Sequence, residues 1–296
     1  MNNANPTIHS KVLNIHGVGI VGRPNTPSVT KYISELIDLL EETSIPYVID
    51  SSLSSTLKEA RSEAFSRLKE FPSWANLLII LGGDGTILKA VHSIPNIMER
   101  YILGVNVGTI GFLAEIEPES IKPVFSHIIN KRPVYLEKSR LLYLSINERV
   151  SFYVLNEILI LSLAFGKVMS FEVFKDDIPL YKGNADGLIL STKTGSTAYI
   201  ASLGGPIVDP SLEVILFGLL CPLRWSFRPI ILPSNSQIRI RILRPGGFVI
   251  GDGLKLATIK GEFHIISWLS DSHVNFIRLS KDSFYNRLRR RLTLEI

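Results

Sequence analysis

The chain has 296 residues and a formal net charge of +5, and 46% of its residues are hydrophobic. Such a composition excludes extensive disorder, which requires fewer apolar and more charged side chains. At roughly 150 residues per domain, the length predicts two domains.

The apolar and cysteine content favours a cytoplasmic protein with no membrane partner. The longest apolar stretch, 214–223, is shorter than the ~20 residues of a membrane span and contains Gly218 and Pro222. The first residues lack the positive and apolar segments of a secretory signal. Cys221 is the only cysteine, which excludes an intrachain disulfide and a multi-cysteine metal site.

The first part of the chain, 11–107, alternates apolar runs with helical periodicity, as expected for βα units over a parallel sheet. The predicted strands are 12–21, 47–49, 77–81 and 102–107. Three helices are predicted. The first follows an N-cap at Ser28, the second spans 57–68, and the third begins at Ile87. This pattern predicts a doubly wound α/β domain.

A first glycine pattern, Gly17-Val18-Gly19-Ile20-Val21-Gly22, matches the G-x-G-x-x-G of dinucleotide-binding folds. Those glycines must form the turn after a strand and open a helix. Here they lie within the predicted strand and precede the turn cluster 23–27. Close packing of the strand backbone is therefore the favoured interpretation.

A second glycine pattern, Gly82-Gly83-Asp84-Gly85-Thr86, follows a buried strand and precedes a helix. Glycines there let backbone N–H groups approach phosphate oxygens, and a helix N-terminus favours anions. Asp84 would repel phosphate unless it held a metal or accepted a proton from an attacking hydroxyl. The alternative is a tight turn with Asp84 as its cap.

A further glycine-rich turn, 104–113, follows the next strand and is expected at the same carboxyl edge of the sheet. Within it, Phe112 either stacks on a base or is an ordinary core aromatic. The two turns are expected to flank one ligand.

After Pro133 short β-rich runs follow one another with turn residues between them, which predicts a mostly β domain. The runs are 141–146, 154–160, 171–174, 178–181, 230–232, 238–243, 248–250 and 263–268. The last segment repeats Phe284, Leu288 and Leu292 at helical spacing and carries Arg287 and 289–291 on its polar side. We expect this helix to return to the first domain with a solvated or phosphate-facing end, and we expect no nucleic-acid partner. The expected domains are therefore 1–133 with the closing helix 279–296, and 134–278.

Two polar segments interrupt the apolar runs of the β-rich half. Asn156 and Glu157 lie inside the predicted strand 154–160, where adjacent side chains point to opposite faces. The asparagine either reads an adenine edge or braces the fold internally. The segment from Asp186 to Tyr199 offers many hydroxyl groups, which suit ribose, phosphate and base edges.

In combination these segments resemble the NAD kinase family over nearly the whole chain. The glycine turn alone is shared with diacylglycerol and sphingosine kinases and with phosphofructokinase-like proteins, but its combination with Asn156-Glu157 and Thr194-Gly195-Ser196-Thr197-Ala198-Tyr199 is specific. The matching segments also include 104–113, Gly22-Arg23-Pro24-Asn25, 204–206, 226–229 and Phe284-Tyr285.

The resemblance implies transfer of the γ-phosphoryl group of ATP, or of polyphosphate, to the 2′-hydroxyl of the adenosine ribose of NAD. It makes Asp84 the catalytic base. It assigns donor phosphate or metal binding to Gly82, Gly83, Gly85 and Thr86, and NAD binding to Asp84, Gly85, Phe112, Asn156, Glu157, Asp186, Thr194, Thr197, Ala198 and Tyr199. It also implies a divalent metal, Mg²⁺, arriving with ATP, and a homodimer or homotetramer.

Three residues depart from the family pattern: Lys193 stands where proline is usual, Leu223 where histidine is usual, and Leu254 where glutamine is usual. The two leucines replace polar groups near the expected dinucleotide site and leave the choice between NAD and NADH open, whereas Lys193 adds a cation beside the loop. The three departures also motivate one alternative, a non-catalytic NAD(P)-binding sensor. The other alternative is a lipid kinase that shares the glycine turn.

Overall fold

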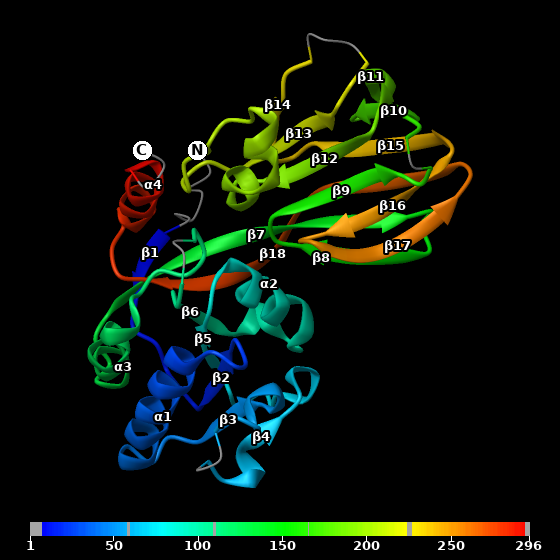
Figure 1. The fold of residues 1–296 in the computed structure, drawn as a ribbon. Helices are drawn as coiled ribbons and strands as arrows, with labels where there is room; N and C mark the ends of the chain where they lie inside the picture. The colour runs from blue at the N-terminus through cyan, green and yellow to red at the C-terminus, as the bar shows by residue number, and fades with distance from the viewer. Residues whose placement is uncertain (1–7, 58–59, 109–110, 165, 224–226, 294–296) are drawn as a thin grey trace. The chain divides into compact units, whose positions relative to one another are not determined.

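The computed structural model describes residues 8–57, 60–108, 111–164, 166–223 and 227–293 (Figure 1). The chain divides into two compact units, one of residues 1–139 with 274–296 and one of residues 140–273. Both boundaries fall within long strands, β7 (Val134–Ile146) and β18 (Phe263–Arg278). The predicted domain limits lie at the ends of these two strands. Within the described residues, no helix is long and apolar enough to cross a bilayer.

The first unit is built on a parallel sheet in the order β4-β3-β2-β5-β6-β18. Its strands are β2 (Val18–Gly22), β3 (Tyr47–Asp50), β4 (Phe65–Ser66), β5 (Leu77–Leu81) and β6 (Tyr101–Val105), with the last residues of β18. A short strand, β1 (Ile8–Lys11), pairs antiparallel with the start of β7. The strand order reverses between β2 and β5, and ligands of doubly wound folds bind at the carboxyl ends of strands at such a point.

Helices cover both faces of this sheet. They are α1 (Pro27–Glu42), α2 (Asp84–Ser93) and α3 (Ile121–Ile129), and the unit also contains the closing helix α4 (Ser283–Thr293). Ile33 of α1 and Phe125 of α3 share one core with alternate residues of β2 and β5. On the other face Ile87 of α2 packs so close to Gly104 that a Cβ there would lie 2.8 Å from its Cδ1. The expected α/β architecture is confirmed, and the closing helix belongs to this unit.

The second unit packs two antiparallel sheets against one shared core. One has the order β11-β10-β15-β18, and the other the order β14-β13-β12-β9-β16-β17; β8 pairs with β7. The strands not yet bounded are β8 (Val150–Val154), β9 (Glu157–Ser162), β10 (Met169–Lys175), β11 (Ile178–Ala185), β12 (Gly187–Thr192), β13 (Val214–Leu220), β14 (Ile230–Pro233), β15 (Gln237–Arg244), β16 (Gly246–Gly251) and β17 (Leu254–Lys260). Every residue of β12 is buried, because the 3₁₀ helices η6 (Thr194–Thr197) and η7 (Tyr199–Leu203) follow it and Ile200 packs on its other face.

One strand predicted for the first unit is too long, and one predicted helix is wrong. The predicted strand 12–21 begins only at Val18, because the side chain of Asn76 bonds the His16 N–H and the Asn14 carbonyl in place of a strand partner. The predicted helix 57–68 is absent from the described part of that segment, 57 and 60–68. That part instead holds the 3₁₀ helix η2 (Ser62–Ala64) and β4, which pairs with β3.

Helix starts and one whole helix were also mispredicted. Helix α1 begins at Pro27, with Thr26 and not Ser28 as N-cap, because a proline lacks the N–H that a first turn leaves unpaired. Helix α2 begins at Asp84 and not at Ile87, so the glycine-rich turn is itself the first helical turn. Helix α3 was not predicted.

In the second unit the predicted strand 154–160 is two strands. Strand β8 ends at Val154 and β9 begins at Glu157. The carboxylate of Asp252 accepts the backbone N–H groups of Leu155, Asn156 and Glu157 at 2.7, 2.7 and 3.1 Å. These bonds replace strand pairing, so Asn156 lies at a break and not inside a strand.

The prediction that Arg287 lies on a solvated face of the closing helix is also wrong, because this side chain is buried. It pairs at 2.9 Å with Glu115, which in turn lies 3.4 Å from the buried Arg278. Burial and the neighbouring Arg278 lower the pKa of Arg287 to about 10, so it stays charged at neutral pH. This arginine fastens α4 to the first unit.

Candidate active site

Asp84 occupies the first turn of α2, directly after β5 and the two glycines that follow it. Its Oδ2 accepts the Phe112 N–H and its Oδ1 accepts the Leu113 N–H, both at 2.9 Å. The structure therefore brings the two predicted glycine-rich turns together on one carboxylate. A carboxylate has about four lone-pair sites. Two of them remain for a substrate proton or a metal.

The glycines around Asp84 differ in how much free space surrounds their backbone. A Cβ on Gly83 or Gly85 would meet nothing within 4 Å, so their backbone faces open space. A Cβ on Gly82 would lie 2.4 Å from Oγ1 of Thr86, and one on Gly111 would lie 2.2 Å from Oδ1 of Asp84. Gly82 and Gly111 thus permit close packing, whereas Gly83 and Gly85 leave room for an approaching anion.

Replacing Gly111 with alanine is expected to displace the Asp84 carboxylate and to lower kcat at least about tenfold, because misplacement of about 1 Å costs on that order or more. Gly83→Ala is the comparison for folding only: its methyl has free space in the unliganded protein, so its unfolding temperature should match wild type, although it would occupy space left for the anion. Steady-state kinetics and thermal unfolding of both variants test this. Equal kcat in Gly111→Ala and wild type would show that the carboxylate does not need this close approach.

In the second unit the end of β12 is hydrogen-bonded to the Asn156 segment, at the break between β8 and β9. The Asn156 carbonyl accepts the Thr192 N–H at 2.9 Å and the Ser191 hydroxyl at 3.1 Å. The Thr192 hydroxyl donates to the Leu155 carbonyl at 2.6 Å and accepts the Gly195 N–H at 3.1 Å. These bonds hold the Asn156 segment against the start of the turn 194–197.

Asp252 was missed as a site residue. It occupies a positive-φ turn between β16 and β17. Its carboxylate also clamps the backbone of the Asn156 segment through the three bonds described above. No sequence pattern indicates that pairing, because the two segments are almost a hundred residues apart.

Three buried acceptors in this part of the second unit have no hydrogen-bond partner within the described residues. They are Asn156 Oδ1, Glu157 Oε2 and Thr194 Oγ1. A buried polar atom left unpaired costs roughly 1–3 kcal/mol, so such atoms mark places where a ligand supplies the missing bond. Burial first, and the nearby Asp252 second, raise the pKa of Glu157 from 4.5 to about 7.

The raised pKa of Glu157 predicts a pH dependence of stability. The folded state holds this proton more tightly than the unfolded chain, so the stabilisation is complete below pH 4.5 and is lost as the pH rises through 7. Across that window the wild type is expected to lose unfolding free energy relative to Glu157→Gln, which cannot ionise. Urea unfolding at several pH values measures the difference. Parallel curves for the two proteins would contradict the raised pKa.

The other predicted site residues are spread over the two units. Thr197 and Ala198 are half-buried beside Thr194, and Tyr199 is exposed at the start of η7. Asp186 is exposed and precedes β12, so it lies at the opposite end of that strand from Thr194. The half-buried Phe112 has its ring 6.2 Å from that of Phe284, which leaves both predicted roles for it open.

The three departures have different surroundings. Leu223 and Leu254 are exposed. Lys193 is buried, and its ammonium pairs with Glu213 at 2.6 Å. The cation expected beside the turn is therefore neutralised by a carboxylate.

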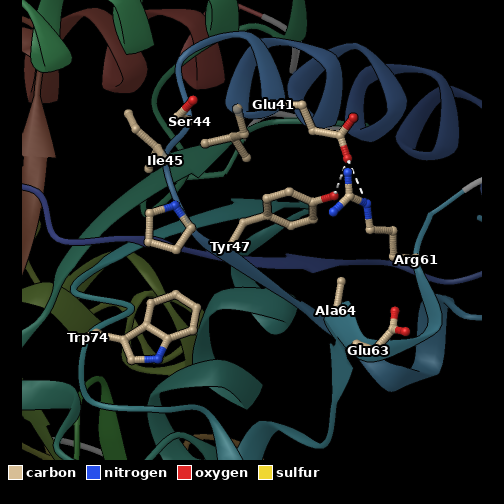
Figure 2. A pocket seen from close by; sticks show the side chains of 10 residues that line it. Glu41, Ser44, Ile45, Tyr47, Arg61, Glu63, Ala64 and Trp74 are labelled. Atoms are coloured by element: carbon tan, nitrogen blue, oxygen red, sulfur yellow. Dashed lines mark hydrogen bonds and ion pairs between the residues drawn. The ribbon is translucent and has the colours of Figure 1, made fainter.

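A cavity of about 640 Å³ lies elsewhere in the first unit, and Figure 2 shows the side chains that line it. Tyr47 donates to Glu41 there at 3.0 Å, and Trp74 lies across the hollow from Arg61. Tyr47 begins β3, whereas Asp84 follows the end of β5. Because the strands are parallel, this cavity lies at the opposite edge of the sheet from the carboxylate.

The described side chains alone give limited support for a metal site. Within the described residues, no group of three or more His, Cys, Asp or Glu side chains lies close enough together to hold a metal ion. The free lone pairs of Asp84 fit a single contact to an ion that arrives with its own phosphate ligands.

Comparison with known proteins identifies the family. Residues 18–133 match the ATP-NAD kinase N-terminal domain, and residues 155–279 match the ATP-NAD kinase C-terminal domain. The NAD kinase of Methanothermobacter thermautotrophicus is 32% identical, over 93% of this chain and 95% of that protein. The chain belongs to the NAD kinase family. The NAD kinase of Thermococcus kodakarensis, at 33% identity over 90% of this chain and 95% of that one, agrees.

Solved structures of NAD kinase relatives share the fold. Yeast NADH kinase in complex with NADH superposes with a TM-score of 0.86 at 25% identity, over 99% of this chain and 92% of that one. The NAD kinase of Archaeoglobus fulgidus in complex with ATP has a TM-score of 0.72 at 23% identity, over 92% of this chain and 99% of that one. As a member of the NAD kinase family, this protein is a phosphotransferase, and the sequence-based assignment is confirmed.

Proposed function

We propose that the protein transfers the γ-phosphoryl group of ATP to the 2′-hydroxyl of the adenosine ribose of NAD, giving NADP. The observation that carries the proposal is Asp84, a carboxylate fixed by two backbone N–H groups at the start of α2. Open space at Gly83 and Gly85 lies on the same turn. A fixed proton acceptor next to an open approach for the phosphate is what transfer to a hydroxyl requires.

In this proposal Asp84 removes the proton from the ribose hydroxyl. A secondary hydroxyl is a weak nucleophile, and general-base help is typically worth ~10²–10⁴ in rate. Gly82, Gly83, Gly85 and Thr86 hold the donor phosphate, since the helix N-terminus attracts anions and the glycines carry no Cβ. A divalent ion bound to ATP, which we take to be Mg²⁺, neutralises phosphate charge.

The unpaired acceptors of the second unit support its role in binding the dinucleotide. The amide of Asn156 both donates and accepts, which suits an adenine edge, and its Oδ1 is buried with no partner in the described part of the chain. Glu157 and Thr194 likewise present buried oxygens that accept from a hydroxyl or amide. The remaining proposed NAD contacts are Phe112, Asp186, Thr197, Ala198 and Tyr199.

A coupled assay tests the reaction. The protein is incubated with ATP, magnesium and NAD, and NADP is detected with an NADP-specific dehydrogenase; parallel reactions contain NADH, polyphosphate or EDTA. We expect NADP with ATP and NAD, and none with EDTA. Tight NAD binding without any product from any donor would instead identify a sensor. A cytoplasmic homodimer or homotetramer remains our expectation, and light scattering measures the oligomer.

A further inference from the structure

A lysine side chain is buried inside the second unit, directly before the turn 194–197. The Lys193 side chain is 3% exposed, and its ammonium lies 2.6 Å from both the Pro210 carbonyl and Oε1 of Glu213. Lysine is rarely buried unless it is paired, because removing its charge from water is costly. Burial of this ion pair therefore costs folding free energy. A benefit from the pair must come from the chain segments that it holds in place.

The pair fastens the turn to the segment 208–213. Lys193 accepts the Ser196 N–H through its carbonyl at 3.1 Å, so its backbone is the base of the turn. A second bond, from the Val208 N–H to the Ser196 hydroxyl at 3.1 Å, joins the same two segments. The ammonium adds the bonds to Pro210 and Glu213, and the turn is anchored at two points.

The anchored turn carries one of the oxygens that have no partner in the second unit. Thr194 Oγ1 is buried without a partner among the described residues, and a Cβ on the adjoining Gly195 would lie 2.3 Å from the Asn156 carbonyl. There is little tolerance for movement in such packing. A turn held in one conformation also avoids the entropy that a ligand would otherwise lose in ordering it.

We propose that Lys193 is a positioning residue that holds the turn 194–197 ready for the dinucleotide by tying it to Pro210 and Glu213. The inference rests on the proposed function, because it takes the turn to be part of the NAD site. Lys193 acts through the backbone and does not contact the ligand.

Two substitutions separate this role from a general effect on folding. Lys193→Ala and Lys193→Pro both remove the ammonium and leave Glu213 without it, so both are expected to lower the unfolding temperature. They differ at the backbone. The φ of Lys193 is −56°, Thr192 before it is in a strand, and strand pairing stops at Thr192, so proline fits this position and fixes it.

We expect Lys193→Ala to weaken NAD binding about 10-fold, since ordering one residue's backbone corresponds to a factor of roughly 5–30 in an equilibrium constant. Lys193→Pro should bind NAD more tightly than Lys193→Ala and close to wild type. Titration calorimetry gives the dissociation constants. Lys182→Ala, which breaks the pair of an exposed lysine with Glu172, is the matched control and should change neither binding nor unfolding temperature appreciably.

Hydrogen–deuterium exchange of the unliganded protein supplies a readout that does not depend on any ligand. Exchange in 194–203 should be faster in Lys193→Ala than in both the wild type and Lys193→Pro, although both variants are less stable than the wild type. Equal exchange in the two variants would overturn the inference. So would NAD dissociation constants that rise equally in both. A wild type that neither binds nor phosphorylates NAD would refute the proposed function, while the exchange comparison would still decide whether Lys193 orders the turn.

Discussion

Asp84→Asn is expected to lower kcat by about 10²–10⁴-fold while NAD still binds, because the variant keeps the shape of the side chain and loses the proton acceptor. Steady-state kinetics with ATP and NAD measure kcat, and calorimetric titration measures NAD binding. A kcat within about tenfold of wild type would remove Asp84 from the role of base.

The structure adds a second consequence of the same substitution. Both carboxylate oxygens of Asp84 accept a backbone N–H, from Phe112 and from Leu113, and an asparagine has only one acceptor oxygen. One N–H therefore loses its partner, which costs roughly 1–3 kcal/mol of unfolding free energy where the group is buried.

A matched control separates the two consequences. Asp50 is a buried carboxylate of the first unit that also holds a backbone N–H, and it accepts the N–H and the hydroxyl of Ser52 at 3.2 and 2.6 Å. Asp50→Asn should lose a comparable amount of stability with kcat nearly unchanged. If it loses as much kcat as Asp84→Asn, the effect at Asp84 reflects disturbed structure and not proton transfer.

Arg278→Met is expected to have the largest effect on stability. Arg278 is 2% exposed, donates to Glu137 at 2.8 Å and to the Leu113 carbonyl at 2.9 Å, and lies beside Glu115. Removing one partner of a buried ion pair typically costs about 3–5 kcal/mol, because the remaining charge is left poorly compensated in the interior. Urea unfolding measures this loss.

The control for that prediction is Arg290→Met. Arg290 pairs with Glu117 at 2.8 Å, but both side chains are about half exposed, at 57% and 49%. Exposed pairs contribute about 0–1 kcal/mol, so this variant should unfold almost like wild type. Similar losses in the two arginine variants would contradict the proposed importance of burial.

Because the Leu113 N–H bonds Asp84, Arg278→Met is also expected to reduce kcat in the fraction that remains folded.

Local signals in the sequence were sufficient for much of the fold. A run of five apolar residues gave β5 with its observed bounds, and the glycine-rich turn after it indicated a strand-to-helix junction. The helix predicted at 57–68 failed because its apolar spacing also suits short 3₁₀ turns around an edge strand. Spacing alone does not distinguish these, since the pairing of β4 with β3 decides the outcome.

The site shows the same division. The sequence alone showed that glycine and aspartate stand at the carboxyl end of β5 and that hydroxyl side chains follow β12, and these residue types indicated the chemistry of the site. Only the tertiary structure decided that Asp84 is held by the backbone of Phe112 and Leu113, that Asp252 clamps the Asn156 segment, and that Lys193 is paired inside the second unit. Those contacts join residues far apart in the chain, and their energies depend on burial, which no local pattern specifies.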